Sequence, residues 1–111
     1  MGLRISGKSV DIGEAFRAHV ETRVGEAVAK YFDGGFSGHV TIEREGSGFA
    51  TDCAIHLDTG IVLQAEGRAQ EVRESFDVAA ERIEKRLRRY KRRLKEHQHP
   101  ALTASRGSPQ N

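Results

Sequence analysis

The sequence has no tryptophan, one cysteine and two prolines among its 111 residues. The single cysteine, Cys53, excludes an internal disulfide and is typical of proteins from a reducing compartment. No apolar run approaches the roughly 18 residues that a membrane-spanning helix needs. The opening segment MGLRISGKSV also lacks the apolar region of a secretory signal. We therefore expect a cytoplasmic protein with no membrane partner.

The residue types that carry catalysis or bind metals do not form a recognisable site. His97 and His99 form an H-x-H pair without further ligands, and the glycines form no phosphate-binding loop. Cys53 falls on the apolar side of a predicted strand and is interpreted as a small buried hydrophobe. The sequence therefore predicts no enzyme activity, no cofactor and no metal site.

Charge is distributed unevenly along the chain, although the formal net charge is only +2. Residues 1–67 hold 6 basic and 10 acidic residues, whereas residues 68–111 hold 12 basic and 6 acidic ones. The first part is thus net −4 and the second net +6. Such a charge asymmetry indicates a charged partner rather than a requirement of the fold.

Apolar periodicity predicts six elements. Asp11 and Glu14 resemble a capping box, and Asp33-Gly34-Gly35 is expected to end the first helix. Gly67 is expected to end the last strand. The predicted order is a strand over 3–6, a helix over about 12–32, strands over 40–43, 49–57 and 61–66, and a helix over about 69–96.

This order predicts an α+β fold with two layers. Each strand has one apolar face, so a four-stranded sheet covered by both helices on one side is the simplest arrangement. The other sheet face would be polar and mostly acidic, carrying Arg4, Thr41, Glu43, Glu45, Asp52, His56, Gln64 and Glu66. We expect a domain over 1–97, followed by a flexible tail or the start of a linker over 98–111.

The last helix carries the most distinctive charge pattern. Eight of the eleven residues from Lys85 to Lys95 are Lys or Arg, and none is acidic. Like charges at i,i+4 spacing are locally unfavourable, which indicates an anionic partner. Arginine outnumbers lysine five to three, as suits bidentate contacts with phosphate. Nucleic acid is the favoured interpretation; a solvated face, an anionic membrane and a calmodulin-like partner are alternatives.

Two further features bear on this interpretation. Arg17, Arg23 and Lys30 are interleaved with acids on the first helix, so they form a solvated face or widen the basic surface. Tyr90 lies within the basic run, on the apolar stripe of the last helix, which is predicted to continue from Leu87 through Tyr90 to Leu94. It is interpreted as a core-edge residue, with stacking on a base as the alternative.

The sequence also resembles a known family. The matching segments are LRISGKSVDIGEAFRAHVETRV, AKYFD, AIHLDTG followed by LQAEG, and SFDVAAERIEKRLRRYKRRLKEH. Together, in this order and spacing, they resemble bacterial ribosome hibernation promoting factors, also called ribosome-associated inhibitors or sigma-54 modulation proteins. The resemblance covers about residues 2–97 and implies a β-α-β-β-β-α fold similar to a double-stranded RNA-binding domain.

The resemblance implies a factor that binds the 30S subunit and its 16S rRNA within the 70S ribosome. Such a factor occupies the decoding centre, blocks the tRNA and mRNA sites, and silences translation in stationary phase or stress. Alternatives are a general double-stranded RNA-binding module and a protein-interaction adaptor. By position, the family's rRNA contacts fall on Arg82, Lys85, Arg86, Arg89, Lys91, Arg92 and Arg93, with helper contacts from Lys8, Arg17, Arg23 and Lys30.

Two points depart from the family pattern. The corner before the last helix reads RAQEVR, from Arg68 to Arg73, where the family has an acidic residue, a spacer and an aromatic. The family's long form also has a C-terminal domain that dimerises ribosomes. We expect the domain alone to be monomeric, since that dimerising domain is not part of this sequence.

Overall fold

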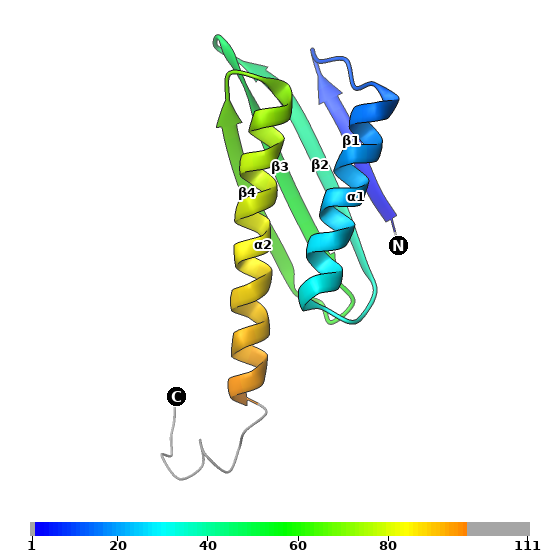
Figure 1. Ribbon diagram of the computed structural model, residues 1–111, viewed down its shortest axis with the longest axis vertical. Helices are drawn as coiled ribbons and strands as arrows, with labels where there is room; N and C mark the ends of the chain where they lie inside the picture. The colour runs from blue at the N-terminus through cyan, green and yellow to red at the C-terminus, as the bar shows by residue number, and fades with distance from the viewer. Residues whose placement is uncertain (1, 98–111) are drawn as a thin grey trace.

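The computed structural model describes residues 2–97, and the side chains of residues 2–94. The predicted tail over 98–111 lies outside the described residues. The observed order confirms the predicted β-α-β-β-β-α succession (Figure 1). The elements are β1 Gly2–Lys8, α1 Glu14–Tyr31, β2 Phe36–Glu45, β3 Gly48–Leu57, β4 Val62–Ala69 and α2 Val72–His97.

The four strands lie in sequence order, so β1 and β4 form the two edges of the sheet. β1 pairs with β2 in parallel, with Ile5 opposite Val40, and α1 makes the connection that a parallel pair needs. β2, β3 and β4 pair as antiparallel hairpins. Their turns contain Gly46 and Gly60 at positive φ, a backbone conformation that favours glycine.

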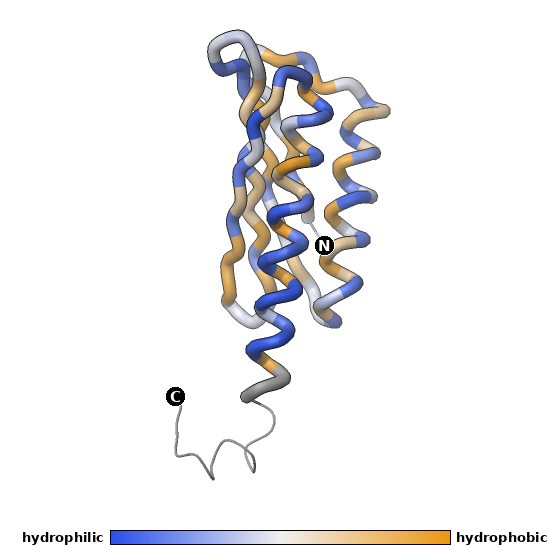
Figure 2. Tube along the Cα trace, turned by 60° about the vertical axis from the view of Figure 1, so that its left-hand side comes forward, coloured by the Kyte–Doolittle hydropathy of each residue, from blue (hydrophilic) through white to orange (hydrophobic). Residues whose placement is uncertain are grey.

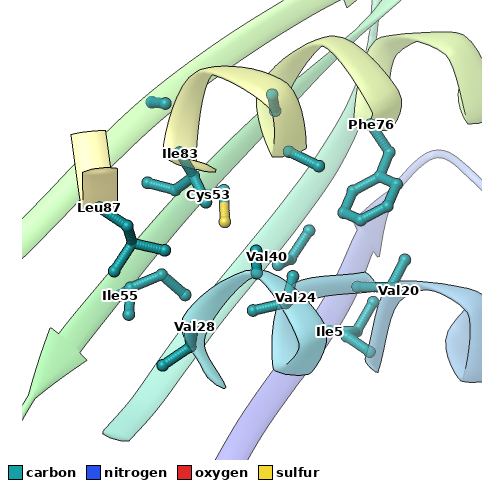
Figure 3. Packing of buried hydrophobic residues seen from close by; sticks show 14 of the residues in the cluster. Ile5, Val20, Val24, Val28, Val40, Cys53, Ile55, Phe76, Ile83 and Leu87 are labelled. Carbon is teal, nitrogen blue, oxygen red and sulfur yellow. The ribbon is translucent and has the colours of Figure 1, made fainter. Parts of the chain in front are cut away.

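Both helices cover one face of the sheet, as predicted (Figure 1). α1 contributes buried valines and an alanine at helical spacing, and α2 contributes Phe76, Ile83 and Leu87. These side chains meet alternate residues of the strands, among them Val40 and Ile55, in a single core (Figure 3). Thr51 and Ser75 are the buried polar pair, and a 2.7 Å hydrogen bond between their hydroxyls satisfies both.

The expected capping box at the start of the first helix is wrong. α1 begins at Glu14 with Gly13 as its N-cap residue, and no side chain makes a capping hydrogen bond there. Asp11 lies two residues too early for the cap position. Glu14 still places a negative charge in the first turn, where the helix dipole favours it.

The expectation that Gly67 ends the last strand is also wrong. β4 continues to Ala69, and Gly67 is buried where β4 passes beneath α2. A Cβ atom at this position would lie 2.4 Å from the carbonyl oxygen of Ser75 and 2.5 Å from the backbone nitrogen of Ala79. Glycine is therefore required for the close approach of α2 to the sheet, and not for a turn.

α2 is longer than the strand that it covers. Its 26 residues extend about 39 Å, whereas the 8 residues of β4 extend about 26 Å. The end of the helix projects past the sheet (Figure 1). Leu94, predicted to continue the apolar stripe, is 37% exposed because the sheet does not reach it.

The open face of the sheet is less acidic than the sequence predicted. It carries Arg4, Glu43, Glu45, Asp52 and Glu66 as predicted, but strand alternation also places Lys8 and Arg68 on it. Arg68 Nε lies 2.6 Å from Glu45 Oε1, and its Nη1 lies 3.4 Å from Glu66 Oε1. These pairs raise the pKa of Arg68, so it remains a cation that neutralises part of this face.

Candidate nucleic-acid interface

The basic segment of α2 is held in one orientation by its buried side. Ile83 and Leu87 are fully buried beneath it. With these positions fixed, the remaining side chains are divided among a flank along β4, a flank along α1 and an outer surface. Figure 2 shows the hydrophilic residues that dominate the second half of this helix. The outer surface carries Lys85, Arg88 and Arg92, all of which are exposed.

The flank along β4 is a row of arginines: Arg82, Arg86, Arg89 and Arg93. Arg82 Nη1 donates a 2.8 Å hydrogen bond to the backbone carbonyl oxygen of Glu66 at the free edge of β4. The row spans about 16 Å along the helix axis. Within the described side chains, none of Arg86, Arg89 and Arg93 has a carboxylate at salt-bridge distance. Among the side chains of residues 2–94, this flank therefore presents uncompensated positive charge.

The flank along α1 is compensated instead. Glu84 accepts a 2.9 Å contact from Arg23 Nη1 and a 3.2 Å contact from Lys30 Nζ. The Tyr31 hydroxyl also donates to Glu84 at 3.4 Å. The predicted helper residues Arg23 and Lys30 are therefore committed to an ion-pair network that joins the two helices.

The protonation of Glu84 reflects this network. Burial by itself would raise the pKa of its carboxyl group. Hydrogen bonds from Lys30 and Arg23, together with their positive charges, outweigh the burial and leave the pKa below its ordinary value. Glu84 is therefore ionised at neutral pH and holds both cations.

Lys91 is seven residues after Glu84, about two helical turns, and therefore lies on the same flank of α2.

Tyr90 packs at the edge of the core, as the core-edge interpretation predicts. Its ring centroid lies 6.4 Å from that of Phe32, and its hydroxyl lies 3.1 Å from Thr59 Oγ1. These contacts fix the ring between the end of α1 and the β3–β4 turn. The remaining part of the ring borders the arginine row.

Two predicted helper residues lie away from the arginine row. Arg17 Nη1 donates a 3.1 Å hydrogen bond to the carbonyl oxygen of Ile5 on β1, the opposite edge of the sheet from β4. Lys8, at the end of β1, lies opposite Glu43 of β2. The structure therefore does not bring Lys8 and Arg17 together with Arg86 and Arg89.

The corner from Arg68 to Arg73, which departs from the family pattern, makes contacts with other parts of the fold. Arg68 binds the acids of the open sheet face. Arg73 Nη2 lies 3.4 Å from His19 Nδ1, and His19 Nε2 lies 3.4 Å from Asp77. Both arginines of this corner thus help to join elements of the fold.

Sequence reasoning missed three residues beside the arginine row: Ile61, Val62 and Gln64. They line a groove along β4 together with Arg86, Arg89 and Arg93. A signal was present, because Ile61 and Val62 are adjacent apolar residues in a segment whose faces otherwise alternate. One of two such neighbours must leave the core face.

Other kinds of site find no support in residues 2–97. The described side chains contain no group of three or more His, Cys, Asp and Glu that converges on a metal position. The H-x-H pair of His97 and His99 lies outside these side chains. No helix in the described part of the chain is long and apolar enough to cross a membrane. Cys53 is buried, and burial, aided by the charge of Asp52, raises the pKa of its thiol to about 12.

Comparison with known proteins gives a consistent family match. Residues 3–95 match the family described as Sigma 54 modulation protein / S30EA ribosomal protein. The chain is 58% identical over 97 residues to a ribosome hibernation promotion factor of Rhizobium meliloti, covering 87% of this chain and 51% of that protein. A protein of the same name from Bradyrhizobium diazoefficiens is 56% identical over 96 residues, covering 86% and 47%. The chain thus spans about half the length of these relatives.

A solved structure supports the fold. The N-terminal domain of Thermus thermophilus Protein Y has a TM-score of 0.73 and 22% sequence identity to this chain. The match covers 81% of this chain and 99% of the other. At this level of identity, the likeness concerns the arrangement of helices and strands.

Proposed function

Because the chain belongs to the Sigma 54 modulation protein / S30EA ribosomal protein family, we propose that it is a ribosome hibernation factor. It binds the 16S rRNA of the small ribosomal subunit at the decoding centre, in the cytoplasm. There it blocks the tRNA and mRNA sites and silences translation under stress or in stationary phase. The names of the two relatives from Rhizobium and Bradyrhizobium support this proposal. The action is occupancy of a site, without catalysis.

The observation that carries the proposal is the uncompensated arginine row on a fixed helix. Arg86, Arg89 and Arg93 have no carboxylate partner among the described side chains, while Leu87 beneath them is fully buried. A cationic surface that is already oriented loses little conformational entropy when it meets phosphates. Arginine also binds phosphate through two parallel hydrogen bonds. The row is therefore suited to a polyanion of fixed shape, such as folded rRNA.

The other predicted contact residues of α2 differ in how directly they would contact the rRNA. Lys85 and Arg92, on the outer surface of α2, extend the cationic surface beyond the row. Lys91 borders the α1 flank, where Arg23 and Lys30 are already paired with Glu84. We place the whole binding function in residues 1–97, with the long α2 as its principal contact surface.

Sedimentation with purified 30S subunits tests the proposal. The variant R86E/R89E reverses two charges of the row, and we expect it to lose subunit binding while keeping its circular dichroism spectrum. The matched control, R4E/R44E, makes the same change of net charge at two exposed arginines of the strands. This control should bind. Equal binding of wild type and R86E/R89E would reject the row as the rRNA contact.

Salt dependence and competition separate the alternatives. If several phosphates are neutralised, log K should fall with log salt by roughly 0.7 to 0.9 per phosphate. A general double-stranded RNA-binding module would bind a duplex competitor as tightly as it binds 30S subunits. An adaptor for an acidic protein would instead be retained on partners from RNA-free lysate and released from the 30S fraction.

A further inference from the structure

A groove of about 320 Å³ runs between the free edge of β4 and the arginine row of α2. This volume lies at the small end of the range for ligand sites, about 300 to 1,000 Å³. The lining combines apolar, amide and cationic side chains and contains no carboxylate. It comprises Ile61, Val62, Leu63, Gln64, Arg86, Arg89, Tyr90 and Arg93.

The apolar wall of the groove is unusual for this molecule. Val62 is 54% exposed and Ile61 is 38% exposed. In the described part of the chain, Leu94 is the only other large apolar side chain of comparable exposure. Tyr90, whose ring is held in place by Phe32 and Thr59, also lines the groove. Apolar groups gathered in one hollow, rather than scattered singly, indicate a surface that a ligand covers.

The polar part of the lining shows what kind of ligand would fit. Arg86, Arg89 and Arg93 form a cationic rim along one side of the groove. By strand alternation Val62 and Gln64 lie on the open face of the sheet, opposite His56 and Ala54, and they border the groove across the edge of β4. Gln64 Nε2 is held there by Asp52 Oδ1 at 3.2 Å and by Oδ2 at 3.4 Å. The hydrogen-bonding groups beside the groove are therefore those of the free backbone edge of β4. A ligand suited to this groove has a flat apolar surface, hydrogen-bonding edges and a negative charge a short distance away.

We propose that the groove binds one unpaired RNA nucleotide. This site would be part of the rRNA contact, so the proposal rests on the proposed function. The base lies against Ile61, Val62 and Tyr90, and the adjoining phosphates lie on the arginine rim. A base-paired duplex hides the faces of its bases in the stack, so it would use the rim and leave the wall exposed. An unstacked nucleotide uses both. The chain therefore recognises a splayed base in rRNA in addition to the backbone shape.

Two RNA oligonucleotides of equal length isolate the contribution of the base. One is an unstructured single strand, and the other carries abasic sites at its central positions, so both have the same phosphates. Titration followed by fluorescence anisotropy should show about tenfold weaker binding of the abasic strand to the wild-type chain, because base contacts with aromatic and apolar platforms strengthen binding to this degree.

The variant I61S/V62S removes the wall and leaves every charge in place. We expect it to bind both oligonucleotides equally, with the affinity of the wild type for the abasic strand and an unchanged salt slope. It should also bind 30S subunits about tenfold more weakly than the wild type. The matched control is L94S, which removes the exposed apolar side chain outside the groove. This control should retain the preference for the base.

The outcomes distinguish this inference from the function on which it rests. Equal binding of the two strands by the wild type, with 30S binding intact in I61S/V62S, overturns the nucleotide site and leaves the hibernation function standing. Binding of an acidic peptide that depends on Ile61 and Val62, without any base preference, overturns it in favour of a protein ligand. Failure of the wild type to bind 30S subunits overturns both proposals.

Discussion

Arg82 Nη1 and the backbone carbonyl oxygen of Glu66 are joined by a 2.8 Å hydrogen bond. The bond fixes how far along the edge of β4 each arginine of the row lies. Counting from this point, the segment from Glu66 back to Ile61 extends about 16 Å, which equals the length of the row from Arg82 to Arg93. The contact therefore aligns the row with the groove at the other end of the strand.

Arg82 should consequently differ from Arg86 when each is replaced by alanine. R82A loses a hydrogen bond to the backbone and should lower the free energy of unfolding by about 1 kcal/mol. R86A removes an unpaired charge from a crowded cationic face, so its effect should stay within about 0.5 kcal/mol. Urea unfolding followed by circular dichroism measures both. Equal destabilisation by the two variants would show that the Glu66 contact contributes nothing to the fold.

Replacement of Glu84 by glutamine should strengthen RNA binding. In E84Q, the positive charges of Arg23 and Lys30 are no longer neutralised. Binding to 30S subunits should tighten and depend more steeply on salt, while stability falls by about 1 kcal/mol. Filter binding over a range of salt concentrations measures the affinity and the slope. Unchanged affinity and slope would place Arg23 and Lys30 outside the interface.

Acid should abolish the stabilising effect of the same carboxylate. The pKa of Glu84 is lower in the folded chain than its ordinary value, so the ion pairs stabilise the fold fully above that ordinary value. The contribution disappears as pH falls through the lowered pKa. The difference in urea midpoint between wild type and E84Q should therefore be present at pH 7 and shrink progressively as the pH falls below the ordinary pKa of a glutamate. A difference that persists in acid would point to packing instead of charge.

Gly67→Ala should destabilise the fold strongly. The new Cβ would meet backbone atoms of Ser75 and Ala79 at 2.4 and 2.5 Å, so α2 has to move away from β4. Overpacking of this kind costs about 2–3 kcal/mol. Gly25→Ala is the matched control, because a Cβ at this position in α1 meets no atom within 4 Å. It should stabilise the helix by about 0.5–1 kcal/mol, and urea unfolding distinguishes the two signs.

Cys53 should be inert in the folded chain. Its pKa of about 12 leaves almost no thiolate at neutral pH, and the side chain is fully buried. The thiolate fraction is about three orders of magnitude lower than that of an exposed cysteine. A chromogenic disulfide reagent should therefore react only as fast as the chain unfolds, and immediately in concentrated urea. Rapid reaction under native conditions would contradict the burial.

The sequence predicted the order of elements and the two-layer fold because apolar periodicity is a local signal. The sequence could not show why glycine is needed at position 67, because this need arises from the close packing of α2 on β4. It also placed Leu94 in the core stripe, because periodicity does not show where the sheet below stops. Both differences arise from tertiary packing.

The candidate site was predictable in part for a similar reason. The arginine row follows directly from helical spacing and the basic run. The neutralisation of Arg23 and Lys30 does not, because Glu84 is more than fifty residues away from both in the sequence. The groove forms because Ile61 and Val62 lie beside α2 in the fold. The sequence pattern of either segment alone does not show that the two are neighbours.

At each edge of the sheet, an arginine of a helix binds a backbone carbonyl oxygen of the edge strand. At β1, Arg17 of α1 binds the carbonyl oxygen of Ile5, and at β4, Arg82 of α2 binds that of Glu66. An open strand edge is a template on which another chain can add a strand and begin to aggregate. Here each helix places a cation on an edge acceptor, so an approaching strand meets a charge and a hydrogen bond that is already made. Arg17 and Arg82 thus each occupy one acceptor on an open edge, which disfavours the addition of a strand from a neighbouring chain.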